Sequence, residues 1–226
     1  MKIVAVHSRF TGSTHAIALM LLDEIGRLEP GAQIDEFCVA GFKPCVGCFS
    51  CFANGEDTCP HYAEVHPIAT AIEQADVVVL DSPTYVMGIS GAMKSFLDHL
   101  AYRWFAHRPH PSMGKKIGVA ISTTGGSGVR GVTKALKAQF FGLSMAKYYR
   151  LGFSIMAFNW GDVNPKKKAR IERAVRRTAR RVVALSGKAK RGLFLRLLLW
   201  GIHFMQQKND WFPLDHQWWK DNGWIK

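Results

Sequence analysis

The sequence predicts an α/β fold in which a parallel β-sheet carries helices on both faces. Three observations lead to this prediction. Apolar runs of strand length alternate with segments whose apolar residues recur at helical spacing, some runs are too apolar to face water on either side, and turn residues separate the two kinds of segment. Strands that alternate with helices form parallel sheets through right-handed crossovers. The chain has 226 residues, 48% apolar and 21% charged, which allows one well-packed core and argues against disorder.

The first strand is KIVAVH at residues 2–7, followed by the turn SRFTGST and a helix over HAIALMLLDEIGRL. A second short strand, AQIDEF, leads into a long cysteine-rich loop and then to a helix near YAEVHPIATAIEQ. The third strand, ADVVVLDSP, ends at Pro83 and is rich in β-branched residues. Its composition suits the centre of a parallel sheet, where both faces are covered.

The second half continues the same alternation. After TYVMGIS come a helix over GAMKSFLDHLAY, the strand KKIGVAISTT, the turn GGSG and a helix over VRGVTKALKAQFFGL. The last strand, AKYYRLGFSI, precedes a basic helix from about Pro165 to Ser186. Five strands in this series suit a flavodoxin-like doubly wound sheet of order 2-1-3-4-5, which binds its ligand at the carboxyl ends of the strands. We expect this domain over residues 1–163 and a helical C-terminal extension over 164–226.

The loops after the strands should converge on that carboxyl edge. In the first loop, hydroxyl side chains surround Gly12 directly before a helix, and Arg9 adds positive charge. Free N–H groups and hydroxyls at a positive helix end suit a phosphate, whereas the alternative is that Ser13 or Thr14 simply caps the helix. The loop lacks the Lys-Ser/Thr ending of a triphosphate loop and the glycine spacing of a dinucleotide fingerprint, so a monophosphate is favoured.

Two further loops offer surfaces for a planar ligand. The third loop has Pro83, Tyr85 and Met87, which form a ledge for a heterocycle unless the two larger side chains belong to the core. The fourth loop, Thr123 to Gly128, has glycines that let backbone N–H groups approach a ligand, although glycines also make ordinary turns.

In these loops the chain resembles the flavodoxin-like NAD(P)H-dependent FMN reductases, a family that includes the iron–sulfur flavoproteins. The similar blocks are SRFTGST, KPCVGCFSC, SPTYVMGISGAMKSFLDH and STTGGSG, and the ending PLDHQWWKDNGW is similar to the tail of some longer members. The resemblance implies that Ser8, Arg9, Ser13 and Thr14 hold the FMN phosphate. It further implies that Pro83, Thr84, Tyr85, Val86 and Met87 line the flavin ring, with Thr124, Gly125 and Gly126 near its polar edge.

The resemblance implies an enzyme that takes hydride from NAD(P)H and passes electrons through FMN to a quinone, a flavin or another small acceptor. Flavin chemistry needs no protein nucleophile, which agrees with the absence of a Ser-His-Asp set or an HExxH motif from the sequence. We expect no catalytic side chain beyond the cofactor. One alternative is an iron–sulfur flavoprotein that carries electrons between protein partners, and another is a membrane- or nucleic-acid-binding module that keeps only the fold.

Four of the five cysteines lie in one segment, as Cys45-x2-Cys48-x2-Cys51-x7-Cys59 followed by Pro60. Iron–sulfur clusters are often held by closely spaced cysteines of this kind, with the last one before a proline. The segment resembles the motif of the iron–sulfur flavoproteins and so predicts a [4Fe–4S] site. Free thiols, structural zinc and a disulfide stay open as alternatives, although zinc usually takes paired CxxC motifs. Cys38, at the end of the second strand, is expected to be buried in the packing.

Positive charge is concentrated in the C-terminal part. Residues 1–150 carry 14 Lys and Arg against 12 Asp and Glu, whereas residues 151–226 carry 16 against 5. A solvated face on the last helix explains most of this excess. The apolar segment GLFLRLLLWGIHFM is too short to cross a bilayer, so we expect it to cover a second subunit in a homodimer or, as the alternative, to contact an anionic membrane surface. Nucleic-acid binding is disfavoured because no known module accompanies the charge. The clustered, odd number of cysteines and the lack of a signal peptide predict a cytoplasmic location.

Overall fold

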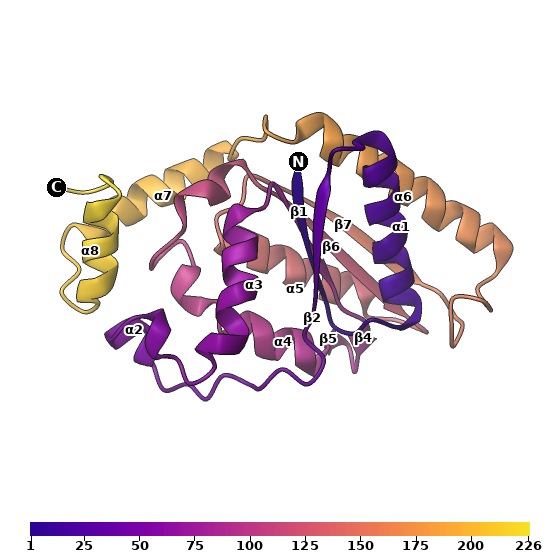
Figure 1. The fold of residues 1–226 in the computed structure, drawn as a ribbon, viewed down its shortest axis with the longest axis horizontal. Coiled ribbons are helices and arrows are strands. Elements are labelled where there is room, and N and C mark those ends of the chain that lie inside the picture. Colours follow the sequence, from indigo (N-terminus) through magenta and orange to yellow (C-terminus); the bar gives the residue numbers. More distant parts are fainter.

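Five parallel strands form the central sheet of the computed structural model, which describes all 226 residues (Figure 1). The strands lie in the order β2-β1-β3-β6-β7. They are β1 (Lys2–His7), β2 (Gln33–Cys38), β3 (Val77–Asp81), β6 (Ile117–Thr124) and β7 (Lys147–Ser154). Numbered within this sheet alone, the order is 2-1-3-4-5, so the predicted fold class and strand order are confirmed.

Helices cover both faces of the sheet (Figure 1). One face carries α1 (Gly12–Leu28) and α6 (Pro165–Leu185), and the other carries α3 (Tyr62–Gln74), α4 (Gly91–Asp98) and α5 (Val129–Gly142). Successive side chains of a strand point to opposite faces. In β3, therefore, Val77 and Val79 pack towards α1 and α6, whereas Val78 and Leu80 pack towards α3, α4 and α5. All five residues of β3 are buried, as a central parallel strand requires.

The register of the strands brings their carboxyl ends to one edge. His7 at the end of β1 pairs with Cys38 on β2 and with Asp81 on β3, and Asp81 in turn pairs with Ile121 on β6. β6 continues for three residues beyond that point, to Thr124. The first, third and fourth loops of the sequence therefore start beside one another, as the parallel sheet predicts.

The structure adds short elements that the apolar pattern does not reveal. The third loop folds into an antiparallel hairpin of β4 (Thr84–Tyr85) and β5 (Gly88–Ile89), and the cysteine segment contains α2 (Ser50–Ala53) and the 3-10 turn η1 (Glu56–Thr58). Two further 3-10 turns, η2 (Ala101–Arg103) and η3 (Pro111–Lys115), link α4 to β6. Elements this short carry too few residues for a periodicity to be recognised.

The C-terminal region divides into two parts. α6 packs on α1 and contributes Ile171, Val175 and Val182 to the core of the sheet domain. α7 (Leu193–Gln206) and α8 (Pro213–Asp221) instead form a small cluster of their own around Ile202, Trp219 and Ile225. The boundary between the sheet domain and the C-terminal extension at residue 163 stays a prediction. None of the helices combines the length and the apolar character needed to cross a membrane.

Candidate functional site

The first loop leaves the positive end of α1 open. Gly12 has a φ of +87°, which glycine adopts without strain, and Thr11 at the N-cap position makes no side-chain hydrogen bond to the helix. Ser13 and Thr14 are buried in the first turn. The Ser13 hydroxyl has no hydrogen-bond partner although it is buried. A buried polar group without a partner costs free energy, so a ligand oxygen here would remove a penalty as well as add a bond.

Hydroxyl groups tie this loop to its neighbours. Thr14 Oγ1 lies 2.6 Å from Thr123 Oγ1 at the end of β6. On the other side, Ser90 donates to the hydroxyl of Ser8 at 2.9 Å, and Ser8 donates to the carbonyl of Asp81 at 2.8 Å. These bonds fix the first loop against β3, α4 and β6. The edge is therefore pre-organised before any ligand arrives.

The third loop projects away from the sheet. Val86 and Met87 form the tip of the β4–β5 hairpin with φ of +46° and +64°, and Val86 is fully exposed. Positive φ is unusual for a β-branched residue and indicates local strain, which is common at functional sites. Tyr85 is 51% exposed, and its hydroxyl accepts from Arg9 Nη1 at 3.4 Å. Arg9 also donates to the Thr11 hydroxyl, so its guanidinium connects the first loop with the third.

The fourth loop packs against the β4–β5 hairpin. Gly128 has a φ of +93°, and a Cβ atom there would lie 2.8 Å from Met87 Sδ. Glycine is thus required both by the backbone and by the close approach of the hairpin. The Thr124 hydroxyl accepts from the N–H of Gly126 at 3.2 Å and donates to the Ser127 carbonyl, which holds the turn in shape.

Together these loops surround a hollow of about 630 Å³, a volume that includes the open space at its mouth. Eight predicted residues line it: Arg9, Ser13, Thr14, Pro83, Thr84, Tyr85, Thr124 and Gly125. Ser8 lines an adjoining hollow with Arg9, Pro83 and Tyr85. Val86, Met87 and Gly126 lie outside both hollows.

Several lining residues were not predicted. His15 and Asp81 contribute from α1 and β3, and Ile155, Ala157 and Phe158 contribute from the segment after β7. Phe158 is fully exposed at the mouth of the hollow. The fifth strand also ends at the carboxyl edge, and this topological signal places residues 155–158 beside the other loops.

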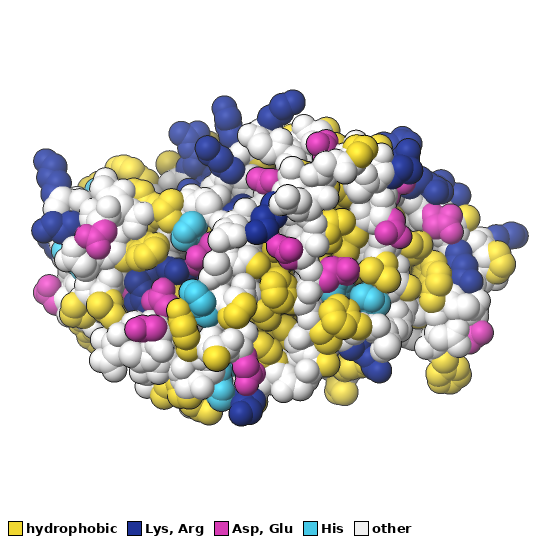
Figure 2. Space-filling view, viewed as in Figure 1, with side chains coloured by type: hydrophobic (Ala, Val, Ile, Leu, Met, Phe, Trp, Pro, Cys, Tyr) yellow, Lys and Arg dark blue, Asp and Glu magenta, His cyan; other side chains and the backbone are white.

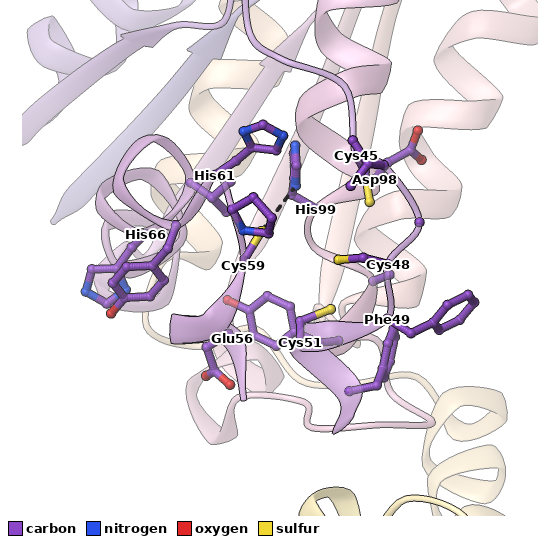
Figure 3. A pocket seen from close by; sticks show the side chains of 18 residues that line it. Cys45, Cys48, Phe49, Cys51, Glu56, Cys59, His61, His66, Asp98 and His99 are labelled. Atoms are coloured by element: carbon purple, nitrogen blue, oxygen red, sulfur yellow. Dashed lines mark hydrogen bonds between the residues drawn. The ribbon is translucent and has the colours of Figure 1, made fainter. Parts of the chain in front are cut away.

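A second hollow, of about 820 Å³, lies in the cysteine segment (Figure 3). Cys45, Cys48, Cys51 and Cys59 line it, and their sulfur atoms point towards its centre from the loop, α2 and the turn before α3 (Figure 3). None of these cysteines is in a disulfide. The spacing of the motif therefore brings all four thiols to one place. Cys38, which was expected to be buried, is only half-buried because it ends an edge strand.

A histidine and an arginine lie near the four thiols. His99 Nδ1 lies 3.9 Å from Cys59 Sγ. Burial raises the pKa of the Cys51 thiol, and the neighbouring Cys59 raises it further, while Arg108 lowers it. Four cysteine thiols around one hollow are the donor types of an iron–sulfur cluster, but no three of their sulfur atoms lie within 4.8 Å of one another, as a single metal ion would need.

The C-terminal helix α8 supports the cysteine segment through Arg108. This guanidinium is 3% exposed and donates to the Cys51 carbonyl at 2.5 Å and to Asp215 of α8 at 2.8 Å. Asp215 is fully buried and also contacts His107 Nδ1 at 2.7 Å. Phe212, just before α8, packs on Phe52 of α2. The sequence PLDHQWWKDNGW therefore docks against the cysteine loop.

Comparison with known proteins points to one family. The profile described as NADPH-dependent FMN reductase matches residues 1–158. An iron–sulfur flavoprotein from Archaeoglobus fulgidus is 30% identical over 132 residues, which are 56% of this chain and 56% of that protein. An NADPH azoreductase from Bacillus sp. is 34% identical over 79 residues, 35% of this chain and 39% of the azoreductase. The chain thus matches between two-fifths and just over half of the length of these relatives.

The solved structure of an FMN-dependent NADH-azoreductase from Bacillus anthracis in complex with FMN has a TM-score of 0.57 to this chain and 14% identity, covering 79% of this chain and all of that one. At this identity the likeness concerns the fold alone. It agrees with the flavodoxin-like sheet described above.

Proposed function

Because this chain belongs to the NADPH-dependent FMN reductase family, we infer that it binds FMN at the carboxyl edge of the sheet and acts as an NAD(P)H oxidoreductase. The observation that carries this inference is the open end of α1, where the buried Ser13 hydroxyl has no partner. Family membership also favours an enzyme over a binding module that keeps only the fold.

The first loop supplies the groups for the FMN phosphate. The uncapped N–H groups of α1 give a positive field, and Arg9 adds a full charge beside it. The Ser13 hydroxyl can donate to a phosphate oxygen without breaking an existing bond. Thr14 is held by Thr123 and Ser8 by Ser90, so these two side chains position the loop. Arg9 and Ser13 therefore contact the phosphate in this proposal, and direct phosphate contacts of Ser8 and Thr14 stay predictions.

The ring of FMN would lie between the third and fourth loops. Pro83, Thr84 and Tyr85 line one side of the hollow, while Thr124 and Gly125 line another. When bound, FMN supplies the capacity to accept a hydride from the nicotinamide and to release electrons to an acceptor. The protein residues orient the ring and restrict the approach of water. Val86, Met87 and Gly126 stay predicted contacts, and their exposed position at the rim suits the part of a bound molecule that projects from the hollow.

As the family resemblance implies, we propose a quinone, a flavin or another small molecule as the physiological acceptor. The test is an absorption spectrum of the full chain purified without oxygen, recorded before and after addition of NADPH. Flavin bands that bleach with NADPH support the proposed activity. A colourless protein that does not take up added FMN would contradict it.

A second function is favoured by the convergence of the four thiols. We propose that Cys45, Cys48, Cys51 and Cys59 hold a [4Fe–4S] cluster that exchanges single electrons with the flavin. Support comes from the four sulfur atoms directed into one hollow, from the adjacent Arg108 guanidinium, which offsets thiolate charge, and from the relative named iron–sulfur flavoprotein. Iron and acid-labile sulfide near four each per chain are expected after anaerobic purification. Zinc alone, or no metal, would contradict the cluster and leave the flavin proposal standing.

The assembly of the protein is a separate proposal. We expect a homodimer, as the resemblance implies. The α7 helix, however, exposes Leu193, Phe194, Leu197, Trp200, Phe204 and Met205. Arg196 within α7 and Lys208 just after it are exposed, and Lys and Arg side chains lie beside apolar ones at the end of the molecule that carries α7 and α8 (Figure 2). An apolar helix face rich in aromatic residues and bordered by positive charge suits an anionic membrane surface better than a second copy with the same charge.

A further inference from the structure

A second polar cluster lies beneath the first loop, where β1, β3 and the first turn of α1 meet. His7 is fully buried, Asp81 is 1% exposed and His15 is half-buried. The Nδ1 atom of His7 hydrogen-bonds to Oδ2 of Asp81 and also lies 3.3 Å from Nδ1 of His15. The flavin and cluster chemistry proposed above requires none of these three side chains.

The proton between His7 and Asp81 leaves the Nδ1 of His15 without a donor of its own. An imidazole nitrogen carries either one proton or one lone pair. If His7 Nδ1 donates its proton to Asp81, it has no lone pair left for His15. The Nδ1 of His15 then faces an N–H that already donates to Asp81. If His15 Nδ1 itself carries a proton, two N–H groups oppose each other. Two ring nitrogens and one carboxylate oxygen, all atom types that bind metals, thus lie within 4.8 Å of one another around one shared proton.

We propose that His7, His15 and Asp81 form a binding site for a divalent transition-metal ion of the zinc class. Zinc binds imidazole nitrogen at about 2.0–2.1 Å, so two ligands in a tetrahedral site lie roughly 3.3–3.4 Å apart. The two Nδ1 atoms already have this separation at 3.3 Å. The Asp81 carboxylate needs only to move back from the His7 ring as the ion replaces the shared proton. Two imidazoles and one carboxylate are a donor set suited to zinc, iron or cobalt.

The groups around the three ligands agree with a metal site. Glu36 of β2 accepts from the far nitrogen of His7, Nε2, at 3.0 Å. Ligating histidines usually donate their second ring nitrogen to a carboxylate, which fixes the tautomer and directs the other lone pair at the metal. Phe10 packs against both imidazoles, with ring centres 5.5 and 5.6 Å away, and shields them from one side.

The fourth position of such an ion faces the 630 Å³ hollow. His15 and Asp81 both line this hollow, whereas His7 lies behind them in the core. Water or an anionic oxygen of a molecule in the hollow would complete the coordination. The site is thus of the open type, with three protein ligands and one exchangeable ligand.

Cobalt binding to the full chain tests the proposal. Cobalt(II) occupies zinc sites and gives visible absorption, and bonds to thiolate add an intense near-ultraviolet band. Because the cysteine segment would also bind the ion, the titration uses the variant Cys45→Ser/Cys48→Ser, whose two replaced side chains are exposed. About one cobalt per chain without the thiolate band is expected. His15→Gln should abolish it, and Glu36→Gln should weaken it by roughly 10–100-fold.

The control is His203→Gln, which removes a half-buried imidazole from α7 and should leave cobalt affinity unchanged. X-ray absorption of the zinc-loaded Cys45→Ser/Cys48→Ser variant provides a second measurement, because Zn–N and Zn–O bonds near 2.0 Å differ from Zn–S bonds near 2.3 Å. A chain that binds no cobalt, or that binds it equally after His15→Gln, would overturn the metal site. His7 would then be a buried imidazolium shared by Asp81 and Glu36.

Discussion

Thr14 Oγ1 lies 2.6 Å from Thr123 Oγ1, and this bond joins the first turn of α1 to the carboxyl end of β6. The two threonines are 109 residues apart in the chain, and both line the same hollow. The bond matters for FMN because it fixes the helix end that faces the phosphate.

Replacing Thr123 by valine should weaken FMN binding without unfolding the protein. The variant keeps the shape of the side chain but removes the bond to Thr14. A hydrogen bond of this kind is worth about 0.5–1.5 kcal/mol, so FMN affinity should fall roughly two- to tenfold. Fluorescence titration with FMN measures the change. Thr133→Val is the matched control, since that buried hydroxyl bonds only to the backbone of its own helix.

Ser13→Ala should weaken FMN binding without lowering the stability of the ligand-free protein. In the ligand-free chain the Ser13 hydroxyl is buried without a partner, so its removal should leave the free energy of unfolding unchanged or raise it. A bond to a charged phosphate is worth about 1.5–3 kcal/mol, so FMN affinity should fall by roughly one to two orders of magnitude. Chemical denaturation without FMN and titration with FMN give the two values. Loss of stability with unchanged affinity would show that Ser13 serves the fold and not the phosphate.

The sheet and its carboxyl edge could be predicted because their signals are local. β3 is a run of four buried apolar residues followed by Asp81, and Ser13 and Thr14 stand directly before a helical pattern. Topology alone then brings these loops together. The β4–β5 hairpin could not be predicted, because two-residue strands have no period and its turn uses Val86 and Met87 at positive φ, where glycine or asparagine would be the usual signal.

Contacts between distant residues account for what the sequence did not reveal. His7 carries no recognisable signal in the sequence, since no metal-ligand spacing connects it with His15 and Asp81, which lie 8 and 74 residues away. Arg108 likewise shows no motif, yet it joins the cysteine loop to α8 through a buried ion pair. Pairings of this kind depend on the register of β1 with β3 and on the docking of the tail.

Cys51→Ser should remove the cluster and spare the flavin. Cys51 lines the second hollow with the other three thiols, and this hollow is separate from the one assigned to FMN. Iron and sulfide per chain should fall close to zero, while FMN content and bleaching by NADPH persist. Cys38→Ser is the control, because Cys38 is half-buried at the end of β2 and outside that hollow. Equal iron content in the two variants would contradict the assignment.

Lys116 gives the folded state a dependence on alkaline pH. Its ammonium group is buried and donates to the carbonyls of Glu73 and Ala75. Burial lowers the pKa of Lys116 to about 8, against 10.5 for a free lysine. Between these two values the unfolded chain binds the extra proton, so the free energy of unfolding should rise with pH from about 8 to 10.5, by at most about 3 kcal/mol. Below pH 8 both states are protonated and this dependence vanishes.

The comparison of the parent chain with Lys116→Met isolates this effect, because the other groups that titrate in the same range cancel in the difference. Urea denaturation at intervals from pH 7.5 to about 10.5 covers the window set by the two pKa values. Lys115→Met serves as the control, since Lys115 is exposed. A parent chain whose stability relative to Lys116→Met stays constant across the window would mean that the buried ammonium keeps its ordinary pKa.

The apolar face of α7 should bind anionic vesicles. Trp200 and Phe204 are 64% and 49% exposed, their rings are in contact, and Arg196 lies one turn before Trp200. Trp200→Ser/Phe204→Ser should therefore reduce sedimentation with phosphatidylserine vesicles, and salt should reduce it further because the basic residues contribute through charge. Ile34→Ser, at an exposed position of edge strand β2, should have no effect. If vesicles do not bind and light scattering instead shows a dimer that the double variant dissociates, the face belongs to a second copy of the chain.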